Sequence, residues 1–141
     1  MKVPTHLQHM PIIGVPFYSK KDGKYAKRAK ISDAKALSIG KAQYEDDEYS
    51  AKVFRYDSRW SPQSEELPFH RVLDLAILLV TTIAKESNID YNSIDLKEEI
   101  VNNENLKGLF DYLTHIDQKI EIIPRLEELK KHIEEALKTY K

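Results

Sequence analysis

One strongly apolar stretch does most to limit the folds open to this chain. Between Pro68 and Glu86 the aliphatic side chains cover most of the circumference of a helix. Pro68 suits the first position of a helix, where its missing N–H needs no partner. A helix that is apolar on nearly all sides is normally buried, so we predict a central helix over 68–86 against which a sheet packs. The longest unbroken apolar run, 75–80, is far below the ~20 residues that span a bilayer, and we expect no membrane insertion.

Two β-rich runs precede this stretch and predict a hairpin. Residues 36–44 and 49–57 are rich in Ile, Val, Tyr and Phe, and the four acidic residues 45–48 separate them. A third short strand is predicted near Arg59 and Trp60. Side chains alternate between the two faces of a strand. In the second run, one face therefore carries Ala51, Val53 and Arg55, and the other carries Ser50, Lys52, Phe54 and Tyr56.

These elements predict an α+β fold with a small antiparallel β-sheet in the N-terminal half. The sheet packs on the buried central helix, and C-terminal helices follow. At 141 residues a single domain is the simplest expectation. We divide it into an extended basic arm over 1–32, a β-hairpin and sheet over 33–67, and a helical part over 68–141. Apolar anchors between residues 12 and 18 predict that the arm packs on the body as an edge strand.

The C-terminal part predicts three helices. Asp95 and Glu98 have the spacing of a capping box and predict a short helix over 95–102. Leucines and a phenylalanine at helical spacing predict a second helix over 106–113. The third is predicted to start at Pro124, and its apolar residues recur at intervals of three and four up to Tyr140. Such a stripe packs either on its own domain or on a second copy of the chain.

Several kinds of chemistry lack their usual signatures in this sequence. The chain has no cysteine, which excludes disulfides and thiolate chemistry. The segment 38–41 resembles part of a phosphate loop but has Lys35 and Ala42 where that motif needs Gly and Ser/Thr. His6 and His9 are spaced like a metal pair without a third ligand nearby. We therefore expect no metal, no cofactor and no enzymatic activity.

Charge is unevenly distributed and leaves two interpretations open. The net charge is −1, yet residues 1–41 carry +7 and residues 86–141 carry −5. Lysines and one arginine crowd residues 20–41, interleaved with Tyr18 and Tyr25. This cluster is either a solvated loop or an anion-binding surface, since arginine matches phosphate oxygens and aromatic rings stack on bases. The small overall charge gives no general attraction to a DNA or RNA polymer, and we expect none as partner.

The candidate ligand contacts are arginines for phosphate or ribose, and aromatic rings for stacking. Arg55 stands out because strand alternation places it beside Val53, where a bare charge needs an acidic partner or an anionic ligand. His70 and Arg71 open the central helix, where backbone amides also favour anions, although a structural hydrogen-bonding role is equally open. The predicted ligand-binding residues are Arg55, Arg28, Arg71, Arg125, Phe54, Tyr56, Trp60, Phe110 and His70.

A resemblance to a known family adds to this interpretation. The segments 33–44, 50–56, 60–66 and 68–76, with a weaker match at 123–128, resemble a family of small bacterial and phage proteins that includes the Thoeris anti-defence proteins, or sponges. The resemblance implies a homodimer or higher homo-oligomer in the cytoplasm of an infected bacterial host. It also implies sequestration of a cyclic nucleotide, a cyclic ADP-ribose isomer, without degradation. Pro62 stands where the resemblance leads us to expect a basic residue.

The sequence leaves three hypotheses about the function open. The first is sequestration of a cyclic nucleotide signal, which needs rigid pockets but no general base. The second is a protein–protein interaction module that uses the amphipathic C-terminal helix. The third is a nucleotide enzyme that works without metal. Release of a bound nucleotide by heat separates the first from the third, because a sponge returns its ligand unchanged.

Overall fold

The computed structural model describes residues 2–6, 8–22, 32–44, 47–56, 67, 69–86, 89–91, 94 and 96–141. The chain divides into two compact units, Met1–Leu109 and Phe110–Lys141. The first unit contains all the strands together with helix α1, and the second contains helix α3.

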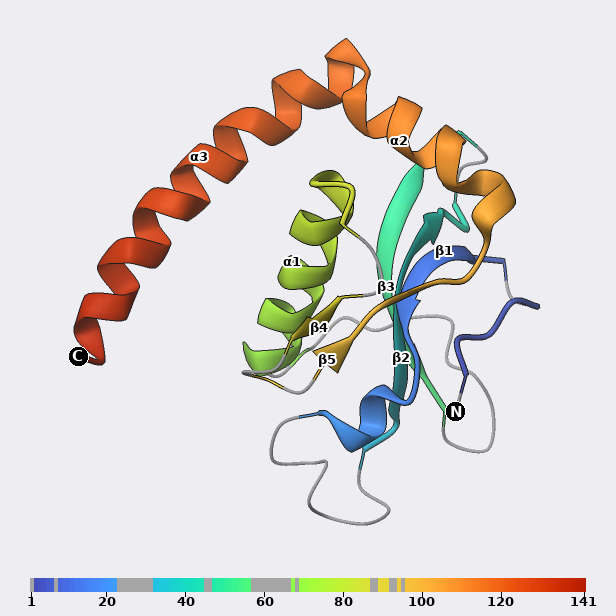
Figure 1. Ribbon diagram of the computed structural model, residues 1–141, viewed down its shortest axis with the longest axis horizontal. Coiled ribbons are helices and arrows are strands. Elements are labelled where there is room, and N and C mark those ends of the chain that lie inside the picture. The colour runs from blue at the N-terminus through green and yellow to red at the C-terminus, as the bar shows by residue number, and fades with distance from the viewer. Residues whose placement is uncertain are drawn as a thin grey trace. The chain divides into compact units, whose positions relative to one another are not determined.

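A four-stranded antiparallel sheet forms the centre of the first unit (Figure 1). Its strands are β1 (Met10–Val15), β2 (Ala34–Lys41), β3 (Tyr49–Arg55) and β6 (Glu99–Ile100), and their order is β3-β2-β1-β6. The predicted hairpin is confirmed, because β2 pairs antiparallel with β3. With helices in the C-terminal half, the predicted α+β class is confirmed as well. The strand predicted near Arg59 and Trp60 lies outside the described residues.

The N-terminal arm contributes an interior strand, so its prediction as an edge strand is wrong. β1 lies between β2 and β6. All residues from Pro11 to Val15 are buried, and Ile12 and Ile13 are buried completely. Apolar residues on both faces suit a strand that is covered on both sides.

Gly40 allows β1 and β2 to approach each other closely. A Cβ atom at this position would lie 2.0 Å from the carbonyl oxygen of Met10, closer than any real contact. The register between the two strands shifts nearby, between Pro11 and Ile13. The glycine that suggested a phosphate loop therefore sits in a β-strand and serves the packing of backbone on backbone.

Helix α1 (Phe69–Ile83) forms where it was predicted, but it is not apolar on its buried side. It contacts β2 and β3. Its buried residues include Arg71 and Asp74, whereas Phe69 and Leu73 are 88% and 61% exposed. The prediction of a fully buried helix is wrong, because polar partners on the body of the first unit hold the polar side of this helix.

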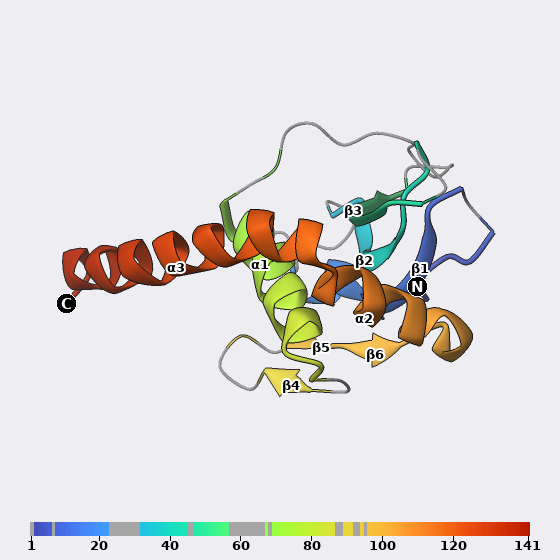
Figure 2. The same cartoon turned by 90° about the horizontal axis from the view of Figure 1, so that it is seen from above.

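The segment after α1 forms short strands in place of the predicted helix over 95–102. β4 (Asp90–Tyr91) pairs with β5 (Leu96–Lys97), and Figure 2 shows β5 running directly into β6. Glu98 does not cap a helix. Its carboxylate is fully buried and accepts hydrogen bonds from the hydroxyls of Thr81 (2.7 Å) and Tyr91.

The two C-terminal helices are α2 (Leu106–Thr114) and α3 (Ile116–Thr139). The first matches the helix predicted over 106–113. The second begins eight residues before the predicted start at Pro124, because the His115 side chain caps it by accepting a hydrogen bond from the amide of Asp117 (3.2 Å). Pro124 lies inside the helix.

Candidate ligand-binding site

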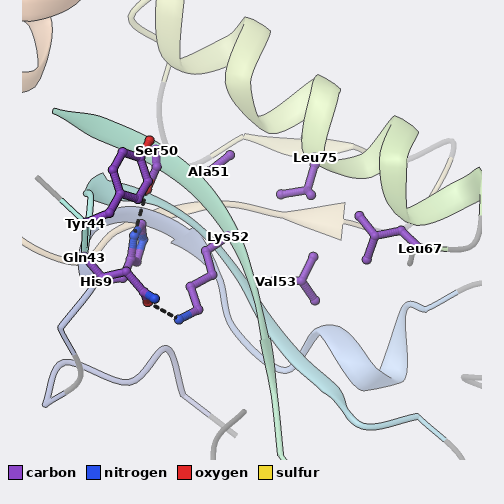
Figure 3. Close-up of a pocket in the computed structure, with 9 residues that line it drawn as sticks. All are labelled: His9, Gln43, Tyr44, Ser50, Ala51, Lys52, Val53, Leu67 and Leu75. Atoms are coloured by element: carbon purple, nitrogen blue, oxygen red, sulfur yellow. Dashed lines mark hydrogen bonds between the residues drawn. The ribbon is translucent and has the colours of Figure 1, made fainter. Parts of the chain in front are cut away.

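A pocket of about 500 Å³ lies along β3, the strand at one edge of the described sheet (Figure 3). Small-molecule sites typically have volumes of roughly 300–1,000 Å³. The pocket takes residues from the segment before β1, the connection after β2, β3 itself, and α1 with the residue shortly before it. Nine described residues line it: His9, Gln43, Tyr44, Ser50, Ala51, Lys52, Val53, Leu67 and Leu75.

The pocket has a polar part and an apolar part. Figure 3 shows Lys52 pointing toward Gln43, while Val53 lies near Leu67 and Leu75. Neighbouring residues of a strand point to opposite faces. The polar part of the pocket therefore lies on the side of β3 that carries Lys52, and the apolar part lies on the side that carries Val53. An amphipathic ligand, with a charged and an apolar portion, suits this arrangement.

His9 supplies a neutral imidazole to the polar part. Its side chain is buried, and its Nδ1 and Nε2 lie 3.1 Å and 3.0 Å from the hydroxyl oxygens of Ser50 and Ser38. Burial, together with repulsion by the ammonium of Lys52, lowers the pKa of His9 to about 4. The ring is therefore uncharged at neutral pH, and both of its nitrogens are occupied by serine hydroxyls.

Lys52 supplies the positive charge of the pocket. Its Nζ donates a hydrogen bond to Oε1 of Gln43 (2.8 Å) and lies 5.3 Å from the ring centroid of Phe54. Burial lowers the pKa of this ammonium below its usual value. A partly desolvated cation interacts more strongly with an anion than one in open water, because the local dielectric is lower.

Tyr44 provides an accessible aromatic ring at the same place. Its side chain is 66% exposed, and Figure 3 shows it beside Ser50. None of the nine described lining residues is an aspartate or glutamate. The described wall of the pocket therefore combines one cation, one exposed ring and several hydrogen-bonding groups without a carboxylate.

Arg71 and His70 meet a buried aspartate. Asp22 is fully buried and accepts hydrogen bonds from Nε (3.0 Å) and Nη2 (2.7 Å) of Arg71, from His70 (2.7 Å) and from the hydroxyl of Ser32 (2.7 Å). Burial by itself would raise the pKa of Asp22, but the hydrogen bonds from Arg71, Ser32 and His70 outweigh it and hold that pKa below its usual value. The structure therefore gives Arg71 and His70 a structural partner, one of the two roles open from the sequence.

Arg55 has the acidic partner that its strand position required. Its Nε lies 3.4 Å from Oδ2 of Asp33, and both side chains are partly exposed. Asp33 also lies 3.9 Å from Nη2 of Arg71. The structure thus brings Arg55, Arg71 and His70 together around two aspartates. Tyr56, half-buried directly after β3, donates its backbone N–H to the carbonyl of Asp33 (2.8 Å).

The other predicted contacts that the structure describes have neighbours of their own. Phe54 is fully buried, and its ring meets that of His9 edge-on with centroids 5.6 Å apart, so it offers no open face for stacking. Arg125 lies on α3 and pairs with Glu121 at 2.8 Å, and Phe110 is half-exposed on α2. Arg28 and Trp60 lie outside the described residues, as do Lys24, Lys27 and Lys30 of the basic cluster.

Sequence reasoning missed the polar part of the pocket as a site, although one signal was present. Strand alternation placed Ser50 and Lys52 on the same face, and both line the pocket. Nothing in the sequence indicated that His9 would lie against Ser38 and Ser50, because those contacts span 29 and 41 residues of chain. The spacing of His6 and His9 pointed only to a metal pair. Among the described residues no group of three or more potential metal ligands is found.

The fold and the pocket define a small α+β protein with a candidate site for a small molecule. The chain belongs to a family of unknown function, DUF6530, whose profile matches residues 1–138. No curated protein and no solved structure matches the chain. Within the described part of the chain, no helix has the length and apolar character needed to cross a membrane.

Proposed function

We propose that this protein binds a small phosphorylated nucleotide in the pocket along β3 and holds it without converting it. The observation that carries the proposal is that Lys52 and the exposed ring of Tyr44 occur together on the described pocket wall. A phosphate group needs a cation, and a base needs an aromatic face.

The division of the pocket supports a ligand with a charged and an apolar portion. In this proposal the phosphate lies at Lys52, the base stacks on Tyr44, and the ribose hydroxyls bond to Gln43 and Ser50. The side chains of Leu67 and Leu75 close the apolar side. The volume of about 500 Å³ suits a ligand of nucleotide size.

Binding without turnover is the simplest role for this set of residues. General acid–base catalysis needs a group that can take a proton near the operating pH. His9 is the imidazole of the pocket, but its pKa of about 4 and its two serine contacts leave it a poor base at neutral pH. We therefore favour capture of the ligand over chemistry.

Cyclic ADP-ribose isomers are the first ligands to test, since the resemblance noted in the sequence implies them. Each carries a pyrophosphate, an adenine and ribose hydroxyls, the three groups that the proposed contacts require. Sequestration of such a signal in the bacterial cytoplasm, against anti-phage defence, is the corresponding biological role.

Calorimetry on the full chain tests the proposal. We expect cyclic ADP-ribose isomers or ADP-ribose to give binding heat and unphosphorylated adenosine to give none. Lys52→Met should weaken binding by about 10- to 100-fold, because charge-assisted hydrogen bonds contribute roughly 1.5–3 kcal/mol. Tyr44→Ala should weaken it by a similar factor, since stacking contributes roughly 1–3 kcal/mol per base.

A matched control removes a lysine elsewhere. Lys97 is well exposed, pairs with Asp90 at 3.9 Å and does not line the pocket, so Lys97→Met should leave binding unchanged. Absence of heat with every phosphorylated nucleotide would refute the proposed function, and equal affinities of the wild type and Lys52→Met would refute the proposed site. Mass analysis of the nucleotide released by heat should show it unaltered, whereas a changed mass would indicate an enzyme.

A further inference from the structure

Helix α3 carries a long apolar face that the second unit does not cover. None of its 24 residues is buried. Ile122 and Leu126 are half-exposed, and the other large apolar side chains are exposed by two-fifths or more. An exposed apolar stripe of this length is unusual on a monomer and marks an interaction surface. On this face the exposed members are Leu129, Ile133, Leu137 and Tyr140, whereas Ile116, Ile120 and Ile123 are exposed on other sides of the helix.

The stripe has the spacing of a coiled-coil seam. Apolar side chains recur at alternating intervals of four and three residues, which keeps them on one side of the helix and facing a partner helix. Pro124 lies on the opposite side of the helix, where it does not interrupt the seam. The seam consists of Ile122, Leu126, Leu129, Ile133, Ala136 and Tyr140.

We propose that α3 pairs in an antiparallel orientation with α3 of a second copy of this chain. In such a pair the seam matches itself about a two-fold axis between Glu127 and Glu128. Leu126 then faces Leu129 of the partner subunit, and Ile122 faces Ile133 of the partner subunit. A two-fold interface must be self-complementary by symmetry. The paired layers of the seam meet this condition, because each contact occurs twice about the axis.

The charges next to the seam favour the antiparallel orientation. A parallel pair in register would place Lys119 against its own copy in the seam and Arg125 near Lys130, both contacts between like charges. The antiparallel pair places Lys119 opposite the small side chain of Ala136, so that its stem packs and its ammonium reaches solvent.

The charge distribution along the helix points the same way. About the proposed two-fold axis, residues 116–127 carry three acids and two bases, for a net charge of −1, and residues 128–141 carry four bases and three acids, for a net charge of +1. Antiparallel pairing sets each half against the half of opposite sign. Charge complementarity of this kind selects the partner and the orientation of a helix pair.

Light scattering of the full chain after size separation, over a wide range of protein concentrations, tests the pairing. We expect a dimer that dissociates on dilution. The double variant Leu129→Glu/Ile133→Glu places a charge in every central layer and should raise the dissociation constant by at least about 100-fold, because unpaired charges resist burial. The matched control Lys131→Gln/Lys138→Gln removes two positive charges from the same half of the helix, the same change in charge as in the seam variant, but on the outer face, and should raise the dissociation constant by no more than about 10-fold.

Engineered cysteines report the orientation, since the chain has none of its own. We expect an oxidised mixture of Leu126→Cys and Leu129→Cys to form a disulfide between the two variants, whereas each variant alone forms little. Homodisulfides of Leu126→Cys alone would overturn the antiparallel arrangement.

A monomer at all concentrations, or a dimer that survives Leu129→Glu/Ile133→Glu, would overturn the pairing itself. Far-UV circular dichroism shows whether the variants keep their helix and sheet content. The residues of the seam do not line the pocket. Ligand binding by the seam variant is therefore measured independently of dimer formation. The dimer can therefore fail while the proposed function holds, and the reverse.

Discussion

At the scale of single residues, His9 shows how the fold keeps a titratable group neutral. Its ring is buried against Phe54 and held between the hydroxyls of Ser38 and Ser50. Protonation would bring a second positive charge into a site that already holds Lys52. The neutral form of this histidine is therefore part of the folded state, and the proton equilibrium of the ring is linked to stability.

This linkage predicts a loss of stability in mild acid. The folded pKa of His9, about 4, lies below the ordinary value of 6.5. As pH falls from 6.5 toward 4, the unfolded chain binds the proton first, so the free energy of unfolding decreases over that window. Between pH 7 and pH 5 the contribution is about 2 kcal/mol.

Urea unfolding at the two pH values measures the effect, with His9→Gln as the comparison. The variant should lose about 2 kcal/mol less than the wild type between pH 7 and pH 5, because glutamine does not titrate. Equal losses in the two proteins would show that His9 is not responsible. The other histidines are common to both proteins, so their contributions cancel in the comparison.

At the scale of elements, helix α1 is attached to the body of the first unit by polar contacts. Arg71 bonds to Asp22, and Asp74 accepts a hydrogen bond from the buried hydroxyl of Tyr18 at 2.5 Å. Tyr18 is part of the 3₁₀ turn Tyr18–Lys20, and Asp22 follows this turn by two residues. Both contacts therefore attach α1 to the same segment. These contacts fix the rotation of the helix about its axis, which leaves Leu73 and Phe69 outside.

Breaking the Arg71–Asp22 pair should be costly. Arg71→Met leaves the buried carboxylate of Asp22 without its guanidinium, and removal of one partner of a buried pair costs about 3–5 kcal/mol. The double variant Arg71→Met/Asp22→Leu should be more stable than Arg71→Met alone, because no unpaired charge remains. Urea unfolding of the two single variants and the double variant gives the coupling free energy.

Leu73→Gln on the same helix is the control and should change stability by no more than about 0.5 kcal/mol, as for other exposed positions. A loss below about 1 kcal/mol for Arg71→Met would contradict the structural role. In that case the arginine would again be available as the ligand contact that the sequence suggested.

The elements that could be predicted from the sequence are those that depend on neighbouring residues. The hairpin of β2 and β3 and the helices α1 and α2 follow from alternation, helical spacing and turn residues within one segment. The interior position of β1 and the strands at 96–100 depend on pairing with distant parts of the chain. Local signals such as a capping box do not report such pairings.

The same division applies to the candidate site. Lys52 and Ser50 follow from alternation along one strand, whereas the place of His9 is set by the strand order. The role of the predicted arginine contacts stayed open for a similar reason. The sequence cannot show that Asp22, 49 residues away from Arg71 along the chain, lies within hydrogen-bonding distance of it. The charge of Arg55 on a strand face that also carries Val53 indicated that it needs a partner. It did not indicate whether that partner is an acidic side chain or a ligand.

At the scale of the whole molecule, the two units differ in what holds them together. The first has a sheet whose strands bury Ile12, Ile13 and Leu37 completely. The second consists of the end of α2 and the single helix α3, none of whose residues is buried. Most helical stability in proteins comes from packing of an apolar face, and no residue of α3 is buried by such packing. Local stability should therefore fall sharply from the first unit to the second.

Native-state hydrogen exchange on the full chain measures this difference. Amides of β1 and β2 should open only with global unfolding, while amides of α3 should exchange by local opening with a much smaller free energy. If α3 pairs with a second copy, its protection should rise with protein concentration, because association stabilises the paired form by mass action. The difference in protection between β2 and α3 should then become smaller as the fraction of dimer increases. Amides of α3 that exchange as slowly as those of β2 at every concentration would instead mean that the helix and the sheet unfold as one cooperative body.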